Sequence, residues 1–384
     1  MKLSYKNKES KNRLDRNLSP IILKAVESFG QTRLFNWHNM LILGDNLVVL
    51  KHLLKERSLY EQIKLIYIDP PFSTNQKYRS GKSRTSTVSF SHKDEIAYAD
   101  QLKGPEYIEF LRKRLLFLKE ILAKDGSIYV HIDYKIGHYV KAIMDEIFGI
   151  ENFINDITRI KCNPKNFDRR GFGNIKDLVL FYSKTNNYIW NDSREKFTEE
   201  DIIRLFHKEE KDGRRYTTTP LHAPGETQNG RTGQIWNGMK PPKGRHWRNS
   251  PEELTKLDKK GLIEWSSTGN PRKKIYADEF NAKGKKRQDI WEFKDSQYPS
   301  YPTEKNLDML KMIIETSSKP DDVVLDSFVG SGSTLLAAEH LGRRWIGIDD
   351  SQIAIEKAKG RLLSIEGISS FTIYETKINS KAKK

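Results

Sequence analysis

The tetrapeptide Asp69-Pro70-Pro71-Phe72 carries an unusual set of hydrogen-bonding groups, directly after the apolar run Leu65–Ile68. Consecutive prolines cannot continue a central strand, so the tetrapeptide is predicted to lie in the loop at the carboxyl end of that strand. The prolines stiffen the backbone and remove its N–H donors, which leaves the Asp69 carboxylate and the Pro70 carbonyl as acceptors. Beside the Phe72 ring, these acceptors suit an amino group that donates two hydrogen bonds while its own ring stacks. The alternative is a simple turn-forming aspartate, which the two prolines make less fitting.

The run from Asp326 to Thr334, Asp-Ser-Phe-Val-Gly-Ser-Gly-Ser-Thr, joins an apolar strand to a helix. Its glycines let the backbone turn tightly and approach a ligand, and the helix that follows offers free N–H groups to an anion. A nucleoside triphosphate loop is excluded, because no Gly-Lys-Ser/Thr sequence follows the glycines. Asp349 ends the next strand and could accept both hydroxyls of a ribose. Together the two features predict an adenosine-like ligand, whereas the glycines alone could form a purely structural turn.

Apolar periodicity places both motifs in an alternation of strands and helices, which is the signature of a parallel α/β sheet. In the first part of the chain we predict strands at residues 41–43, 65–68 and 127–132, and helices at 47–54, 105–122 (ended by Gly126) and 138–148 (capped by Gly149). In the last part we predict a helix from Glu304, strands at 323–325 and 345–348, and helices at 334–341 and 351–363. The polar residues 73–103 are predicted to form a long mobile loop over the site.

Between these parts, residues 156–300 are richer in glycine, proline and basic side chains, and their apolar periodicity is weak. Basic clusters alternate there with tryptophans; the clusters are Lys161–Arg170, Lys240–Arg248, Arg272–Lys274 and Lys283–Arg287, and the tryptophans are Trp236, Trp247, Trp265 and Trp291. Cations bind phosphate and aromatic rings stack on bases, so the set as a whole indicates DNA contact. Any single member could equally be a solvated charge or a core tryptophan.

The composition fits a polyanionic partner. The chain has 384 residues with 67 Lys and Arg against 51 Asp and Glu, a formal net charge of +16. Such an excess favours binding to nucleic acid through the release of condensed counterions, although a basic solubilising surface is the alternative. The single cysteine, Cys162, excludes an internal disulfide and a cysteine-rich zinc site. The charged N-terminus has no apolar core and no run is long enough to cross a bilayer, so we expect a cytoplasmic protein with no membrane association.

Taken together, Ile-Tyr-Ile-Asp-Pro-Pro-Phe ending at Phe72 and Leu-Asp-Ser-Phe-Val-Gly-Ser-Gly-Ser-Thr ending at Thr334 resemble an amino DNA methyltransferase of the permuted β group. The chain is most similar to the modification subunits of type III restriction systems and their stand-alone adenine-specific relatives. Further stretches agree with this resemblance: Leu43–Asn46, His131–Asp133, Met144–Gly149 and Trp345–Asp349. The family's His-Pro-x-x-Lys-Pro stretch reads Tyr301-Pro302-Thr303-Glu304-Lys305-Asn306 here, with Asn306 at the second proline.

The resemblance implies a doubly wound, Rossmann-like α/β fold that is circularly permuted and carries an inserted target recognition domain. The implied domains are a flexible basic arm (1–30), a catalytic part (31–155), a target recognition insert (156–300), a cofactor-binding part (301–367), and a C-terminal strand with a basic tail (368–384). The implied cofactor is S-adenosylmethionine, with no metal. Asp69, Pro70, Pro71 and Phe72 would be catalytic; the cofactor would be bound by Asp45, Lys305, Asp326, Phe328, Gly330, Ser331, Gly332, Ser333, Thr334 and Asp349. Asp45 could equally cap the helix that begins at Asn46, or do both.

The same resemblance implies methylation of N6 of an adenine flipped out of double-stranded DNA, since an Asp-led motif with Phe is common in adenine enzymes. N4 of cytosine is the alternative acceptor, and a homodimer or a partner restriction subunit is possible in this family. Methylation of RNA or of a protein amide is disfavoured, because those enzymes carry Asn in place of Asp69 and place the glycine loop first. A non-catalytic specificity subunit is disfavoured because Asp69–Phe72 is intact.

Overall fold

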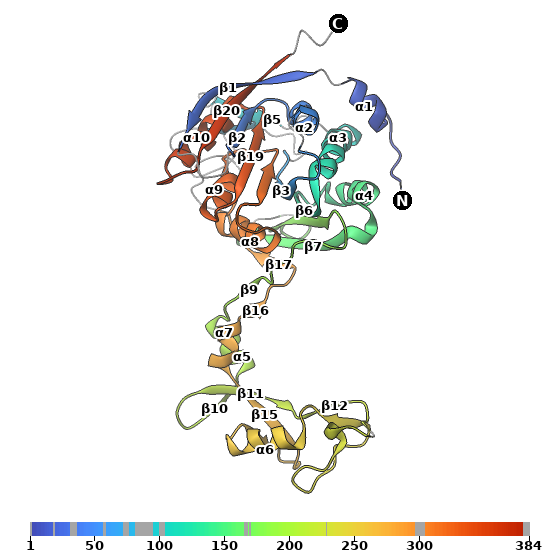
Figure 1. Cartoon of the computed structure of the whole chain (residues 1–384), viewed down its shortest axis with the longest axis vertical. Helices are drawn as coiled ribbons and strands as arrows, with labels where there is room; N and C mark the ends of the chain where they lie inside the picture. Colours follow the sequence, from blue (N-terminus) through green and yellow to red (C-terminus); the bar gives the residue numbers. More distant parts are fainter. Residues whose placement is uncertain are drawn as a thin grey trace. The chain divides into compact units, whose positions relative to one another are not determined.

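The computed structural model describes residues 2–17, 20–30, 37–56, 59–71, 77–80, 95–99, 104–164, 168, 170–227, 229–295 and 304–378. The chain forms two compact units (Figure 1). Unit 1 comprises Met1–Asp192 and Gln288–Lys384, and unit 2 comprises Ser193–Arg287.

A mixed sheet forms the centre of unit 1, and its described part has ten strands. In spatial order they are β1 (Ile21–Phe29), β20 (Phe371–Ile378), β2 (Asn39–Leu43), β19 (Arg344–Asp349), β18 (Val323–Asp326), β3 (Ile63–Ile68), β6 (Leu122–Ile132), β8 (Lys176–Ser183), β7 (Phe153–Ile160) and β17 (Ile290–Glu292). The six strands from β20 to β6 run parallel, whereas β1 and β8 flank them antiparallel. The carboxyl ends of β3 and β18 are therefore neighbours, although the two strands are far apart in the sequence.

Helices cover both faces of this sheet, because its strands are apolar on both sides. Ile42 and Ile66 are buried in one hydrophobic core, whereas their neighbours Leu41 and Leu65 are buried in a second one. Helices that contribute to the first core are α2 (Asn46–Glu56), α3 (Pro105–Ile121) and α4 (Gly137–Phe148); those of the second are α8 (Leu307–Ser317), α9 (Ser333–His340) and α10 (Gln352–Leu363). The predicted fold class, a doubly wound α/β sheet with a permuted strand order, is confirmed.

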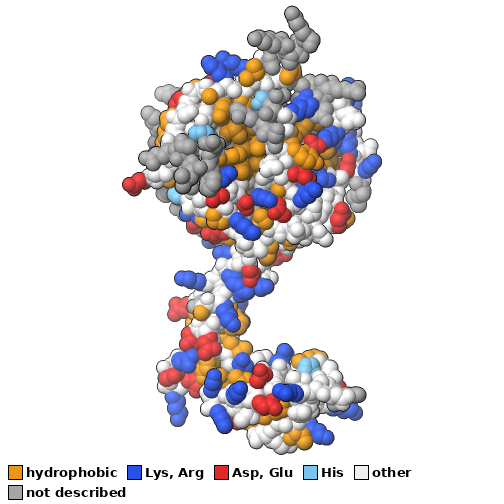
Figure 2. All heavy atoms as spheres, in the orientation of Figure 1, with side chains coloured by type: hydrophobic (Ala, Val, Ile, Leu, Met, Phe, Trp, Pro, Cys, Tyr) orange, Lys and Arg blue, Asp and Glu red, His pale blue; other side chains and the backbone are white. Residues whose placement is uncertain are grey.

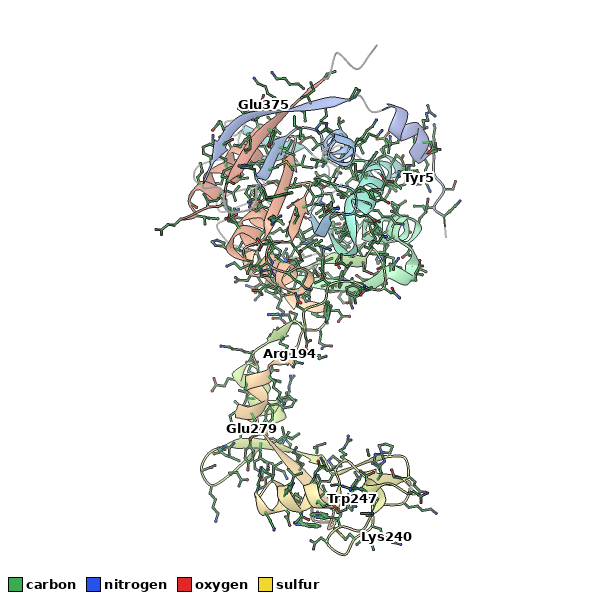
Figure 3. The ribbon with its side chains drawn as sticks, viewed as in Figure 1. Tyr5, Arg194, Lys240, Trp247, Glu279 and Glu375 are labelled. Atoms are coloured by element: carbon green, nitrogen blue, oxygen red, sulfur yellow. The ribbon has the colours of Figure 1, made fainter. Side chains whose placement is uncertain are left out.

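The N-terminal segment differs from the flexible arm that the sequence suggested. Residues Lys11–Asn17 form helix α1, and β1 pairs along its length with β20. Leu14 is buried, and the Lys8 ammonium lies 2.6 Å from Glu146. Tyr5, which is labelled in Figure 3, donates its hydroxyl hydrogen to Glu109 at 2.6 Å. Polar side chains of this segment thus bind partners on α3 and α4 and hold the segment against unit 1. The predicted C-terminal strand is β20, while the basic tail, 379–384, lies outside the described residues.

Two further predictions need correction near the site. The segment 73–103 is not wholly a loop, since β4 (Lys77–Ser80) pairs antiparallel with β5 (Glu95–Ala99). The other residues of this segment lie outside the described part of the chain. Gly126 does not end a helix. Helix α3 stops at Ile121, and Gly126 lies inside β6, where a Cβ would come within 2.9 Å of the Ile63 carbonyl oxygen. The glycine permits a bulge in the pairing of β3 with β6.

Unit 2 has a small core of its own, made of Leu221, Trp236, Trp247, Leu254 and Ile263. Its elements are β9 (Arg194–Glu195), α5 (Glu199–Leu205), β10 (Lys208–Glu209), β11 (Arg215–Pro220), β12 (His222–Pro224), η2 (Arg231–Gly233), β13 (Arg245–Trp247), α6 (Pro251–Lys259), β14 (Ile263–Trp265), β15 (Pro271–Tyr276), α7 (Ala277–Lys283) and β16 (Lys285–Lys286). The separate unit is narrower than the predicted insert, 156–300, because β7, β8 and β17 belong to the main sheet.

Candidate active site

The two sequence motifs meet at one pocket at the carboxyl ends of β3 and β18. Asp69 follows β3 directly, and Asp326 is the last residue of β18. Parallel neighbouring strands place such residues at the same edge of a sheet, where open α/β folds bind ligands. The described residues that line the pocket include Tyr67, Asp69, Pro70, Pro71, Phe110, Lys305, Asp326, Phe328, Gly330, Ser331, Ser333, Thr334 and Asp349. Phe72 lies outside the described residues.

The two carboxylate oxygens of Asp69 have different surroundings. Oδ2 forms an ion pair with the Lys305 ammonium at 2.6 Å, and the two side chains are only 16% and 9% exposed. Oδ1 is buried and has no hydrogen-bond partner among the described residues. A buried acceptor without a donor is costly to maintain, so it marks a position that a ligand donor would satisfy.

The glycine loop turns sharply before α9. Gly332 has φ +79°, and a Cβ at this position would lie 2.8 Å from the Cβ of Ala358. The helix α9 that follows has no side-chain cap at its N-terminus among the described residues, which leaves its first N–H groups for an anionic ligand group. Arg361 fixes the loop by donating to the Ser331 carbonyl at 2.9 Å and to the Ser333 hydroxyl at 3.0 Å.

Asp326 is buried below this loop and is 2% exposed. Its Oδ1 accepts the Phe328 N–H at 2.9 Å. Burial raises the pKa of Asp326 to about 7; hydrogen bonds from Thr334 and from the Phe328 N–H lower it, whereas the nearby Asp69 raises it further. The structure thus holds an ionisable acid at the pocket wall that a cationic ligand group would stabilise in its charged form.

Asp349 connects β19 to the glycine loop. Its Oδ2 accepts the Gly330 N–H at 2.8 Å and its Oδ1 accepts the Ser351 N–H at 3.0 Å. Burial raises the pKa of Asp349 to about 6, against the lowering effect of these two hydrogen bonds. A carboxylate has about four acceptor positions, so two remain for a ligand hydroxyl group.

Asp45 has the capping role in the structure. Its Oδ1 accepts the Val48 N–H at 3.1 Å, as a helix cap does, and its Oδ2 accepts a hydrogen bond from Arg114 at 2.9 Å. Among described residues, the pocket is lined by Asn46 and Arg114 rather than by Asp45. Asn46 in turn donates to the Ser327 carbonyl at 2.6 Å, so α2 is tied to the glycine loop. The cap was one of the two roles that the sequence left open for Asp45.

Pocket residues to which the sequence analysis gave no site role include Asn46, Tyr67, Phe110 and Arg114. Phe110 and Arg114 lie one turn apart on α3, and the guanidinium stacks 3.6 Å from the Phe110 ring centroid. The sequence carried a signal for both, because an arginine four residues after an aromatic ring lies on the same helix face and can stack on that ring. Tyr67 could not be distinguished from a core residue in its strand.

A buried polar chain lies behind Asp69. The Tyr67 hydroxyl is 2.8 Å from His131 Nδ1, and His131 Nε2 is 3.4 Å from Asp177. Burial lowers the pKa of His131 and raises that of Tyr67, so both are neutral near pH 7. Although burial raises it, the pKa of Asp177 is held below its usual range by hydrogen bonds from His131 and Lys161. Nε2 therefore carries the histidine proton toward Asp177, and the Tyr67 hydroxyl donates to Nδ1.

Within the described part of the chain, no cluster of three or more His, Cys, Asp or Glu side chains could hold a metal ion. In the same part, no helix has both the length and the apolar character needed to span a membrane.

Comparison with known proteins gives consistent matches over most of the chain. The type II methyltransferase M.EcaI of Enterobacter cloacae is 40% identical over 365 residues, which are 94% of this chain and 77% of that protein. The type III restriction-modification enzyme StyLTI Mod subunit of Salmonella typhimurium is 26% identical over 342 residues, which are 82% of this chain and 52% of that protein. The chain thus spans about half the length of that Mod subunit.

Among solved structures, the M1.HpyAVI–SAM complex aligns with a TM-score of 0.42 and 17% identity, covering 84% of this chain and 100% of that one. At this TM-score and identity, the structural match adds no evidence to the sequence matches. The DNA methylase family model matches residues 63–360, which contain both motifs and the pocket. The chain therefore belongs to the DNA methylase family, whose members transfer methyl groups to DNA from S-adenosylmethionine.

Proposed function

We propose that this chain transfers a methyl group from S-adenosylmethionine to the exocyclic N6 of an adenine flipped out of duplex DNA at a specific sequence. The observation that supports this is Asp69, whose side chain lines the same pocket as the glycine loop and whose buried Oδ1 has no partner among the described residues. N4 of cytosine remains the alternative acceptor, because the same acceptor geometry would serve either amino group. An Asp-led motif with Phe favours adenine.

The chemical task of Asp69 follows from the weakness of its substrate. The lone pair of a base amino group is delocalised into the ring, so the nitrogen is a poor nucleophile. In our proposal Asp69 and the Pro70 carbonyl accept the two amino hydrogens and thereby direct the lone pair out of the ring plane. They also stabilise the positive charge that develops on the nitrogen during transfer, because they are already oriented in a site with little water. Phe72 would stack on the base, and Pro71 would hold the turn.

The other half of the pocket has the groups that S-adenosylmethionine requires. When bound, this cofactor supplies an electrophilic methyl group on a sulfonium. The loop from Phe328 to Thr334 would hold its methionine part, with Asp326 accepting from the ammonium and the free N-terminus of α9 facing the carboxylate. Asp349 would accept from the ribose hydroxyls. Gly332 supports the fit by letting the loop turn tightly before α9, because its φ of +79° is one that residues with a side chain rarely adopt.

The proposal is tested by incubating the protein with a labelled methyl donor and mixed-sequence duplex DNA, followed by nucleoside analysis. We expect label in N6-methyladenine. Label in N4-methylcytosine would replace the adenine assignment, and no labelled nucleoside with any duplex would contradict the methyltransferase itself. The Mod subunits among the relatives are named for restriction-modification systems, so we propose that setting here, with a homodimer or a separate restriction subunit as possible partners.

Unit 2 is proposed to contact the DNA, and the ion pairs among its described residues favour one of the three predicted clusters that lie in this unit. Lys274 and Lys285 form ion pairs with Glu210 and Asp201, both at 2.6 Å, so these clusters bind acidic side chains within the unit. By contrast, no carboxylate of the described residues pairs with the four exposed cations of the remaining cluster, Lys240, Lys243, Arg245 and Arg248. Basic and acidic groups are interspersed elsewhere on the visible face of the unit (Figure 2).

The predicted stacking role fits only some of the tryptophans. Trp236 and Trp247 are 4% and 1% exposed and form the core of unit 2, while Trp291 is 8% exposed in unit 1. In Figure 3, Trp247 lies among side chains, whereas Lys240 lies on a loop at the edge of the unit. Trp265 is 42% exposed and stacks on Trp236 at 5.9 Å, so its outer face could still meet a base. Buried rings are not available for stacking on DNA.

Removing two of these cations should weaken DNA binding through fewer phosphate contacts. The double variant Lys240→Ala/Lys243→Ala is expected to lower DNA affinity about tenfold near physiological salt, and to reduce the slope of log K against log salt by about 2. Fluorescence anisotropy with a labelled duplex over a salt series measures both. The control Lys256→Ala/Lys259→Ala removes the same charge from exposed positions of α6. Equal losses in both variants would show that the charge of the whole unit, and not this cluster, binds the DNA.

A further inference from the structure

The Lys305–Asp69 ion pair assigns a different role to Lys305 from the one that the family resemblance implied. By resemblance Lys305 would hold the carboxylate of the cofactor. In the structure its ammonium lies 2.6 Å from Asp69 Oδ2, and both side chains are largely buried. The lysine therefore contacts the residue that is proposed to act on the base. It binds Oδ2, and the other oxygen, Oδ1, is the acceptor without a partner among the described residues.

We propose that Lys305 is a positioning residue for Asp69: by binding Oδ2 it fixes the carboxylate so that Oδ1 remains the acceptor for the target amino group. This rests on the proposed function of Asp69. The last torsion of an aspartate side chain is broad, so a carboxylate without a fixed partner would turn in the pocket. An ion pair in a buried site is stronger than one in water, because the local dielectric constant is lower, so it can hold the carboxylate in one orientation.

The backbone around Lys305 is itself fixed. Asn306 caps α8, since its Oδ1 accepts the Met309 N–H at 3.0 Å and its amide donates to the Lys294 carbonyl at 3.0 Å. Glu304 pairs at 2.7 Å with Arg361, which also holds the glycine loop. Asn306 is the residue that departs from the family's proline, and the cap explains how this sequence keeps the helix start without it.

The charges around Asp69 also favour this role. Tyr67 and His131, from β3 and β6, are held neutral by burial, and Asp326 at the end of β18 is an acid whose pKa Asp69 raises. Lys305 is the cation that the structure places against the Asp69 carboxylate. It therefore compensates the burial of that charge while leaving one oxygen for the substrate.

The test separates the two roles of Lys305 by the parameter that each would change. In Lys305→Met we expect kcat to fall about tenfold or more, because Asp69 is no longer held, while the dissociation constant for S-adenosylmethionine changes by less than about threefold. Lys305→Arg should recover part of kcat. The matched control Lys311→Met, on the helix α8 that begins two residues after Lys305, should leave both values unchanged. A raised dissociation constant with an unchanged kcat at saturating cofactor would overturn the proposal and return Lys305 to the cofactor carboxylate.

A second measurement does not depend on activity. We expect Lys305→Met to lower the melting temperature by about 2–4 °C, because it leaves Asp69 buried without its partner. Adding Asp69→Asn to that variant should lower it little further, so the two effects are not additive. Strict additivity would overturn the pairing. A wild-type protein that methylates nothing but shows this coupling would refute the proposed function and leave the ion pair standing.

Discussion

Replacing Asp69 with alanine is expected to lower kcat for DNA methylation by about 1000-fold or more, while binding of S-adenosylmethionine and of duplex DNA stays within about threefold of wild type. The variant removes the buried Oδ1 that has no partner among the described residues, and with it the acceptor that orients the amino lone pair. It does not touch the glycine loop or unit 2. Single-turnover methyl transfer measures the chemical step, and calorimetry and anisotropy measure the two binding steps.

The control for this variant is a second aspartate with a similar lysine partner. Asp125 pairs with Lys64 at 2.6 Å, but both side chains are about one third exposed and neither lines the pocket among its described residues. Asp125→Ala should therefore leave methylation unchanged. Retained methylation in Asp69→Ala would refute the acceptor role. Loss of cofactor binding in the same variant would indicate that Asp69 acts on the cofactor and not on the base.

The meeting of the two motifs was predictable from the sequence because it depends on local patterns. Continuous apolar runs such as Leu65–Ile68 predict buried parallel strands, and the residues that follow them must lie at one edge of the sheet. The structure places Asp69 and Gly330 in one pocket accordingly. Gly149 was also read correctly as a helix cap, with φ +96°, since a glycine after an apolar helix is a strong local signal.

Features that depend on distant partners were not predictable. The N-terminal segment looked like a loose arm because its polar partners, Glu146 and Glu109, are more than 100 residues away in the sequence. The partner of β1 is the strand β20, at the other end of the chain. The same limit applies to Lys305, for which the family resemblance implied a cofactor contact but whose ammonium contacts Asp69. Side-chain pairing across a pocket leaves no periodicity in the sequence.

Replacing Asp326 with asparagine is expected to have opposite effects on stability and on cofactor binding. The folded protein raises the pKa of Asp326 from 3.8 to about 7 by burial. Between these values the folded state keeps a proton that the unfolded state has lost, so this group makes the fold less stable as the pH rises from about 4 to 7. Asparagine removes that penalty. The variant without cofactor should therefore gain roughly 2–4 kcal/mol over wild type at pH 8 and nothing at pH 4, measured by urea unfolding.

Cofactor binding should change in the other direction, because the proposed ammonium of S-adenosylmethionine requires an ionised Asp326. For the wild type we expect the affinity to rise as the pH increases from 5.5 through about 7, in step with loss of the Asp326 proton. Asp326→Asn should lose about 100-fold in affinity at pH 7.5 and most of this pH dependence, although Asp349 still titrates near 6. Glu366→Gln, at an exposed position, is the control for the charge change. An Asp326→Asn protein that binds the cofactor as tightly as wild type at pH 7.5 would place the ammonium elsewhere. A variant no more stable than wild type at pH 8 would show that burial does not raise the pKa of Asp326.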